Sequence, residues 1–490
     1  MHAQMSAASI KLSIARNVAG YAGNVQQNAG RWLPKIRSEI YMKFRTTQKL
    51  AAFALGFIFF ACNRTPKDAD TALPTNTIIS DSAWTGQYLL PEPDTNASHD
   101  NFSEIVGWKE DKTPIAPSGF MVSKFAEGFQ SPRWIYEAPN GDILIAESAT
   151  ESSLIKKAGA ILSGKAKAGQ QKPSANRITI LRDADKDGLP ELRKIFLTGL
   201  KQPLGMLIIG DFFYVANTNG IITYPYKTGD TQLNTVAGKR IMILPAGGYN
   251  NHWTRNIVTN SDNSKIFVSV GSGSNVGEHG MQNEIRRANI LEINPDGTQE
   301  RIYASGLRNP VGMDWAPGTT TLWTSVNERD GLGDNLVPDY LTSVRESAFY
   351  GWPYSYFGQH EDPRLKGKAP QMVIKAILPD VPLGSHTASL GLAFYDKKAF
   401  PGKYHNGAFI GQHGSWNRST PVGYKVVFVP FKGSRPAGPP EDFLTGFIAD
   451  ETKNEVYGRP VGLAVLRDGS LLVADDASNV IWRVSAASKK

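Results

Sequence analysis

Short apolar segments separated by polar turns recur along most of the chain, from about residue 120 to residue 485. Each unit begins with a chain break, continues with a small apolar segment and a polar turn, and ends with a second, richer apolar segment. Apolar runs of this length between turn residues are typical of β-strands, and helical periodicity is scarce. The six units are 132–134 with 141–147, 203–206 with 210–215, 254–257 with 265–270, 310–313 with 321–326, 389–392 with 407–410 and 460–463 with 469–474.

The repeat has roughly the length of a propeller blade with loop insertions. One blade cannot bury both faces of its sheet, so the blades must stack around a common axis. The pattern therefore predicts an all-β, six-bladed β-propeller over residues 116–490, in which equivalent loops of every blade meet at one central site. We also expect the last strand, 480–484, to close the ring beside early strands.

The N-terminal segment, residues 1–62, has the layout of an export signal. Three basic residues precede an apolar run, 50–61, that ends at the only cysteine, Cys62. The run is shorter than the about 20 residues of a membrane span and fits the apolar part of a signal peptide. We predict a start at Met42, cleavage before Cys62, and a periplasmic or outer-membrane-anchored lipoprotein. Ordinary signal cleavage stays open, because Phe59 stands where lipoprotein signals usually have leucine.

The positive charge of the chain belongs mostly to this leader. Residues 1–62 hold eight Lys or Arg and one acid; subtracting these from 53 basic and 45 acidic residues leaves 45 and 44, a net charge of +1. No basic face for nucleic acid is therefore expected. Residues 63–115, rich in Pro, Asp, Thr, Ser and Asn, are predicted to be a flexible linker. With one cysteine, the exported part has no intramolecular disulfide.

The residues that precede the first strand of each blade should surround the mouth of the central channel. They include several cations and no carboxylate: Arg133, Gln202, His252, Arg255, Arg308, Asn309, His386 and Arg459. Four arginines and two histidines around one axis repel one another unless an anion lies among them. The planar fork of arginine suits carboxylates, so the pattern predicts a small, planar polyanion as ligand. We expect one or two of these arginines to pair instead with Asp or Glu from neighbouring blades.

Several further residues are candidates for proton transfer or metal binding. His252 lies in a polar loop at the repeated position, which favours a general base, because imidazole titrates near neutral pH. His386 and His413 are left open between direct and supporting roles. The Gly-rich loop 327–340 is dense in oxygen donors and suits calcium, although an acid-rich surface loop fits equally well. The run 183–188 imitates the start of a calcium loop, but lysine holds its twelfth position, which favours a polar hairpin.

Four longer motifs resemble the sorbosone dehydrogenase family, soluble-type sugar dehydrogenases that use pyrroloquinoline quinone and are related to soluble quinoprotein glucose dehydrogenase. The motifs are 306–313, 327–340, 350–354 and 411–418, within a similarity that spans about 120–485. The resemblance implies a six-bladed propeller that holds calcium and pyrroloquinoline quinone (PQQ), a planar tricarboxylate. It also implies a quinoprotein oxidoreductase acting on CH–OH or aldehyde groups of sugars. Such an enzyme oxidises an aldose or a sorbosone-like substrate by hydride transfer to the quinone.

The resemblance implies roles for individual residues as well. His252 matches the general base, and the other catalytic positions that line substrate and quinone are Gln202, Arg308 and Asn309. Cofactor contacts are expected from Arg133, Arg308, Asn309, Arg418 and Arg459, with Arg418 in place of a family lysine. Calcium is expected on the backbone carbonyls of Arg329 and Asp330, with a second calcium ion at Asp334 and Asp339. Ser272 stands where the glucose enzymes have Asp, so the substrate of that branch does not transfer.

Two alternatives stay open: a calcium-dependent lactonase propeller, and a propeller that binds a partner without catalysis. The lactonase would need acidic and amide side chains around an axial ion. The chain has no Cys-x-x-Cys-His motif for a c-type haem, so a dehydrogenase would pass electrons to a separate acceptor, a quinone or a cytochrome. Membrane association is expected only through a lipid on Cys62.

Overall fold

The computed structural model describes residues 89–96, 99–109, 111–151 and 173–487. The predicted leader, with Cys62 and its lipid anchor, lies outside the described residues. The described chain is nearly all β, with one α-helix, α4 (Pro370–Lys375), so the all-β prediction is confirmed at that level. No helix in these ranges combines the length and the apolar character that crossing a membrane requires.

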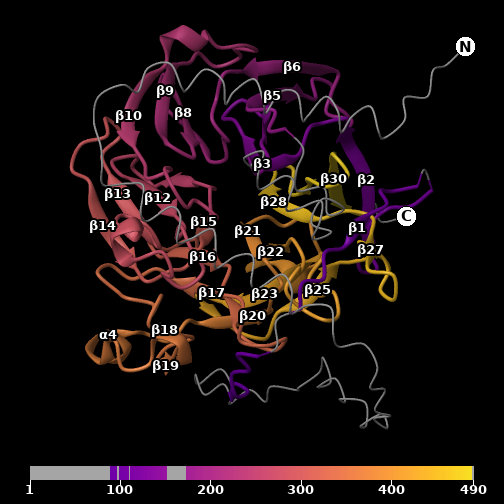
Figure 1. The fold of residues 1–490 in the computed structure, drawn as a ribbon. Helices are drawn as coiled ribbons and strands as arrows, with labels where there is room; N and C mark the ends of the chain where they lie inside the picture. The colour runs from indigo at the N-terminus through magenta and orange to yellow at the C-terminus, as the bar shows by residue number, and fades with distance from the viewer. Residues whose placement is uncertain (1–88, 97–98, 110, 152–172, 488–490) are drawn as a thin grey trace, which may run out of the picture. The chain divides into compact units, whose positions relative to one another are not determined.

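Each of the six sequence repeats opens one antiparallel sheet of four or five strands (Figure 1). The first three sheets contain β3 (Pro132–Glu137), β4 (Ile143–Glu147), β5 (Arg177–Arg182) and β6 (Leu192–Leu197); β7 (Met206–Ile209), β8 (Phe212–Asn217), β9 (Gly220–Pro225) and β10 (Lys239–Ile243); and β11 (Ile257–Thr259), β12 (Ile266–Val270), β13 (Asn289–Ile293) and β14 (Arg301–Ser305). The next three contain β15 (Pro310–Trp315), β16 (Leu322–Val326), β17 (Pro338–Ser343) and β20 (Val381–Ser385); β21 (Ser389–Tyr395), β22 (Gly407–Gln412), β23 (Lys425–Lys432), β24 (Arg435–Pro436) and β25 (Glu441–Leu444); and β28 (Pro460–Val465), β29 (Leu471–Asp475), β30 (Val480–Ala486) and β2 (Phe120–Glu127).

Smaller elements connect these sheets. They are a parallel and antiparallel trio, β1 (Glu104–Ile105), β27 (Glu455–Val456) and β26 (Ile448–Asp450); a short pair, β18 (Ser355–Tyr356) and β19 (His360–Glu361); and the 3-10 turns η2 (Thr235–Ala237), η3 (Met281–Glu284), η4 (Pro363–Leu365) and η5 (Gly402–Tyr404). Strand β1 comes from the predicted linker 63–115, and it pairs in parallel with β27. The predicted domain boundaries stay a prediction.

Burial follows the position of a strand in its sheet. Every residue of the second strands β4, β12, β16, β22 and β29 is buried. The outer strand β2 instead alternates between more and less exposed residues. Strands that are covered on both faces read as continuous apolar runs, whereas half-covered strands alternate. The apolar clusters accordingly join consecutive sheets, as where Leu207 of β7 and Ile257 of β11 belong to one buried group.

A repeated glycine lets the inner strands of neighbouring sheets approach closely. A side chain at Gly391 of β21 would lie against the Val461 carbonyl of β28, and one at Gly462 would lie against the backbone of Arg133 in β3. Only a residue without Cβ fits so near another backbone. The glycine that four of the six repeats share at this position (Gly205, Gly312, Gly391 and Gly462) therefore marks contact with the next sheet, a physical reason for the sequence pattern.

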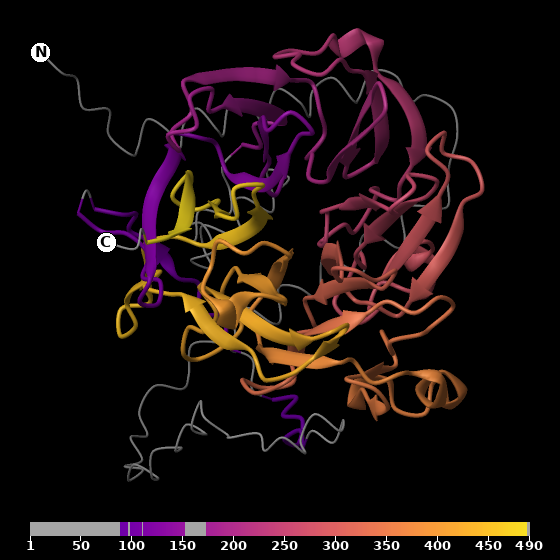
Figure 2. The same cartoon turned by 180° about the vertical axis from the view of Figure 1, so that it is seen from behind.

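The sheets close on themselves through strands that are far apart in sequence. The last strand, β30, lies beside β2, as Figures 1 and 2 both show, and the two pair antiparallel with Val484 opposite Val122 in the register. This confirms the prediction that the C-terminal strand lies beside early strands. The sheets that begin with β3 and β7 are joined by the Ser148 hydroxyl, which donates to the Pro203 carbonyl at 2.7 Å.

Candidate active site

One cavity of about 190 Å³ lies at the ends of the inner strands, where five of the six large sheets contribute lining residues. In an antiparallel pair, the start of the first strand lies beside the end of the second, so loops of both kinds meet there. The charged side chains, imidazoles and side-chain amides among its lining are Arg133, Asn251, His252, Asn309, His413, Arg459 and Asp476.

The structure brings four of the predicted site residues to this cavity: Arg133, His252, Asn309 and Arg459. Gln202 lies beside it, because its side-chain amide donates at 2.9 Å to the carbonyl of Ala149, which lines the cavity. The remaining predicted residues are not among the lining residues: Arg308, Arg329, Asp330, Asp334, Asp339 and Arg418.

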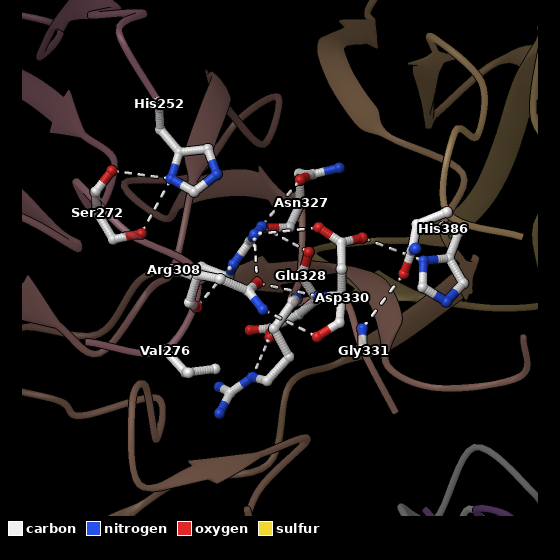
Figure 3. A network of polar contacts seen from close by, with 12 residues as sticks. His252, Ser272, Val276, Arg308, Asn327, Glu328, Asp330, Gly331 and His386 are labelled. Atoms are coloured by element: carbon white, nitrogen blue, oxygen red, sulfur yellow. Dashed lines mark hydrogen bonds and ion pairs between the residues drawn. The ribbon is translucent and has the colours of Figure 1, made fainter. Parts of the chain in front are cut away.

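Ser272 fixes the ring of His252 (Figure 3). Nδ1 of His252 lies 2.8 Å from the Ser272 carbonyl oxygen and 2.9 Å from Ser272 Oγ. A carbonyl can only accept, so Nδ1 carries the proton and the lone pair of the neutral ring is on Nε2. The pKa of His252 lies well below its usual value, first because burial disfavours imidazolium and then because Arg308 is positively charged. The cavity therefore contains a neutral base.

Next to His252, Arg308 is held in a network of oxygen atoms (Figure 3). The residue is 3% exposed, and Nη1 donates to the Glu328 carbonyl at 2.6 Å. Asp330 joins it to His386: one Asp330 oxygen lies 3.5 Å from Arg308 Nη2, and the other lies 3.2 Å from His386 Nδ1. Burial lowers the pKa of His386, but the hydrogen bond and charge of Asp330 outweigh it and raise the pKa. Arg308 thus lies next to His252 and already has hydrogen-bond and ion-pair partners.

A carboxylate that the repeat pattern did not reveal lies in the cavity. Asp476 forms an ion pair with Arg133, and its other oxygen lies 2.8 Å from Nε2 of His413. Burial raises the pKa of Asp476, but the charges of His413 and Arg133 lower it far more, so it stays ionised. Arg133 lies in β3 of the first large sheet, and Asp476 follows β29 of the last large sheet, which lies next to the first. This confirms that one arginine pairs with a carboxylate of a neighbouring blade.

Arg459 is the cation of the cavity with the fewest partners. It is 2% exposed, and its guanidinium lies 5.6 Å from the centre of the Tyr424 ring. Two of its nitrogen atoms, Nε and Nη2, have no hydrogen-bond partner in the described part of the chain. A buried guanidinium without hydrogen bonds is costly, so its donors call for an anion in the cavity. The Nε atom of Arg133 also lacks a partner within the described ranges.

The other predicted cations point elsewhere. Arg418 donates to the backbone carbonyl of Asp334 rather than into the cavity. Arg255 is fully buried, and Nη2 donates at 2.8 Å to the Pro245 carbonyl. Burial, followed by the nearby charge of Arg287, lowers the pKa of Arg255 to about 9. Arginines at the same phase of the repeat therefore do not share one direction.

Two of the predicted calcium ligands, Asp330 and Asp339, have hydrogen-bond partners of their own. The Asp330 carbonyl accepts hydrogen bonds from Asn275 Nδ2 at 2.9 Å and Arg364 Nη1 at 2.8 Å. Asp339 is buried and accepts at 2.7 Å from the backbone of Ser389 and at 2.8 Å from that of Glu328.

Within the described residues, the one group of at least three acidic or metal-binding side chains close enough to hold a metal is the hairpin with Asp183, Asp185, Asp187 and Glu191. Their ligand atoms lie within 4.8 Å of one another. Exposed acidic groups of this kind are common without an ion, and the prediction of a polar hairpin is not tested by this spacing.

Comparison with known proteins identifies the family. A family model for glucose/sorbosone dehydrogenases matches residues 230–415, and one described as TrAA12-like matches residues 371–487. The chain belongs to the glucose/sorbosone dehydrogenase family. The resemblance inferred from the sequence motifs is thereby confirmed.

Two relatives of this dehydrogenase family member show how far the likeness extends. An uncharacterized protein of Borreliella burgdorferi is 31% identical over 382 residues, which cover 75% of this chain and 89% of that protein. The pyrroloquinoline quinone-dependent pyranose dehydrogenase of Coprinopsis cinerea is 26% identical, but the match spans only 43% of its length.

Solved structures share the fold. The holo form of the PQQ domain of that pyranose dehydrogenase superposes with a TM-score of 0.61 at 20% identity, covering 78% of this chain and 100% of the domain. A calcium structure of the Trichoderma reesei carbohydrate-active enzyme of family AA12 gives 0.61 at 18% identity, covering 76% of this chain and 97% of that one.

Proposed function

We propose that this chain is a six-bladed propeller enzyme that oxidises a hydroxyl or aldehyde group of a sugar with PQQ as its cofactor. Each of the six large sheets would be one blade. One observation carries the proposal: the unpartnered guanidinium of Arg459 and the neutral base His252 line the same cavity. The first implies an anionic ligand and the second implies proton transfer, a combination that a quinone dehydrogenase requires.

The residues present fit a planar tricarboxylate. Arg459 and Arg133 offer three buried nitrogen atoms without partners, and Asn309 Oδ1 is a buried acceptor without a donor. These groups are suited to carboxylates and to a polar ring edge, respectively. When bound, PQQ would supply the two-electron oxidant. The side chains of this chain would hold it, exclude water and move the substrate's proton.

His252 is the proposed general base. Because Nδ1–H donates to the Ser272 carbonyl, Nε2 can accept the proton of a substrate hydroxyl or of a hydrated aldehyde. The ionised Asp476 faces the same cavity and can accept hydrogen bonds from other sugar hydroxyls, while Nε2 of His413 donates to it. Calcium stays a prediction, because the Asp330 carbonyl already accepts two hydrogen bonds and offers no ready ligand.

The identity of residue 272 should set the acid limit of the reaction. A base works only when deprotonated, and the low pKa of His252 keeps it so as the pH falls. In Ser272→Asp, a carboxylate beside Nδ1 would stabilise imidazolium, raise the pKa of His252 and move the acid limb of kcat/KM upward by about one pH unit or more. Ser272→Ala, which adds no charge, is the matched control. An unchanged acid limb in Ser272→Asp would argue that another group is the base.

Cofactor dependence tests the proposed function directly. Purified protein is mixed with calcium, with and without PQQ, an artificial electron-accepting dye and a panel of aldoses, aldehydes and lactones. Dye reduction that requires PQQ is the expected result. Lactone opening without PQQ would instead support the hydrolase, and absence of both reactions would support a binding propeller.

The physiological setting is part of the proposal. With no haem-binding motif in the sequence, electrons would leave to a separate quinone or cytochrome acceptor. The leader and Cys62 favour export to the periplasm or attachment to the outer membrane by a lipid. Mass spectrometry of the mature N-terminus would establish whether Cys62 is lipidated.

A further inference from the structure

Residues 99–108, which we call the N-terminal strap, cross the loops around the candidate active site. The strap contacts two parts of the fold. The backbone N–H of Asn101 donates at 2.8 Å to the carbonyl of Trp416, between β22 and β23, and β1 pairs with β27 just before β28 (Figure 1). The Phe102 ring stacks on Trp416, with ring centres 5.5 Å apart. The loops that it crosses carry His413 and Arg459, two of the residues that line the cavity.

One strap residue reaches the cavity itself. Ile105 is partly buried and lines it, whereas its neighbours Glu104 and Val106 are exposed. Alternate residues of a strand point to opposite faces, so pairing of β1 with β27 directs one side chain inward and the next outward. The register Ile105↔Val456 places this apolar side chain close to the start of β28, which follows Arg459.

Two other strap residues hold the surroundings of Arg459. The Ser103 hydroxyl lies 2.7 Å from the Tyr424 hydroxyl, and the ring of Tyr424 faces the Arg459 guanidinium. The indole N–H of Trp108 donates at 2.8 Å to Asp475 Oδ2, and the other oxygen of Asp475 accepts the Arg459 backbone N–H at 2.8 Å.

The side chains that make these contacts are buried or packed against aromatic rings. Ser103 is fully buried, and the Trp108 ring contacts the rings of Phe447, Tyr457 and Trp482. Asp475 is fully buried, and burial raises its pKa. A buried carboxylate that orients a backbone donor needs its remaining lone pairs filled, and the Trp108 indole is the shorter of two indole donors to Asp475 Oδ2, at 2.8 Å against 3.4 Å for Trp482.

We propose that the N-terminal strap completes the anion-binding cavity, with Ile105 as an apolar wall and with Ser103 and Trp108 as positioning residues for Arg459. The inference rests on the proposed function for the identity of the anion, but not for the presence of an anion site. A strap that only fastened the chain end would leave anion affinity unchanged when its inward-facing side chain is enlarged.

A pair of adjacent substitutions separates these cases. Ile105→Trp should push a large ring into the cavity, whereas Val106→Trp, at a residue 46% exposed, should leave it open. Dissociation constants of both full-length variants are measured by calorimetry for PQQ and for benzene-1,3,5-tricarboxylate, a redox-inactive planar trianion. We expect Ile105→Trp to weaken both affinities about tenfold or more, a loss near 1.4 kcal/mol, and Val106→Trp to stay within about twofold.

A second variant covers the case in which Ile105→Trp fails to fold. Trp108→Phe keeps an aromatic ring but removes the shortest side-chain donor to Asp475, and should weaken tricarboxylate binding about fivefold, as expected for loss of one hydrogen bond of about 1 kcal/mol. Its turnover at saturating PQQ should be preserved, because the strap acts on binding. Unchanged affinity in folded Ile105→Trp or in Trp108→Phe would overturn the proposal.

The outcomes also separate this inference from the proposed function. If the wild-type protein oxidises sugars with PQQ but the strap variants bind it normally, the strap proposal fails and the function stands. If strap-dependent tricarboxylate binding is found without sugar oxidation, the strap proposal stands and the function fails. A wild-type protein that binds neither trianion would contradict both.

Discussion

Replacement of His252 by alanine should lower the turnover number for sugar oxidation at least about a hundredfold, the low end for proton transfer by a positioned base. The reason is that His252 is neutral, faces the cavity and has its lone pair on Nε2 because Ser272 holds the proton of Nδ1. The measurement is steady-state dye reduction at saturating PQQ and substrate, with the PQQ dissociation constant determined separately. That constant should change little, since His252 is assigned to proton transfer.

His360→Ala provides a matched control. His360 begins the short strand β19, is exposed and is not among the cavity-lining residues, and its Nδ1 lies 2.9 Å from the Phe357 carbonyl. Its loss should leave the turnover number within about twofold of wild type, as is usual for exposed positions without special contacts. Near wild-type turnover in His252→Ala, with PQQ bound, would remove His252 from the reaction.

The strand pattern was predictable because it is local and repetitive. Short apolar runs between turn residues can be recognised without tertiary information, and each of the six repeats does open one sheet. Pairing of β30 with β2 followed from the need of a ring to close. The same regularity placed His252, Asn309 and Arg459 at one cavity, because each precedes an inner strand.

Site residues that do not precede an inner strand could not be predicted from the repeat. Asp476 follows a second strand, and only the antiparallel pairing of β28 with β29 brings it beside the inner-strand starts. Ile105 and Trp108 lie in a segment whose polar composition predicts a linker, and their contacts depend on side chains from the last third of the chain. Composition alone does not reveal a pairing of two residues per strand.

The direction of long side chains was the other limit. The repeat predicts four arginines around one axis, but Arg255 donates to backbone carbonyls and Arg308 lies in an oxygen network with Asp330. Arg133 has Asp476 as its counter-ion. Because an arginine side chain has several rotatable bonds, the backbone position of the residue does not fix where its guanidinium lies. The structure thus leaves much less uncompensated positive charge than the sequence predicts, and it concentrates that charge on Arg459.

That concentration makes Arg459 the most sensitive position for ligand affinity. Arg459→Gln should weaken binding of PQQ and of benzene-1,3,5-tricarboxylate about 10- to 100-fold, since hydrogen bonds to charged groups contribute about 1.5–3 kcal/mol. Fluorescence or calorimetric titration of the full-length variant measures this, and turnover should recover in part at high PQQ concentration. Arg435→Gln, at an exposed residue of β24, is the control and should bind both trianions as wild type does. Wild-type affinity in Arg459→Gln would mean that its unpartnered guanidinium does not meet the ligand, and the central argument for an anionic cofactor in this cavity would fail.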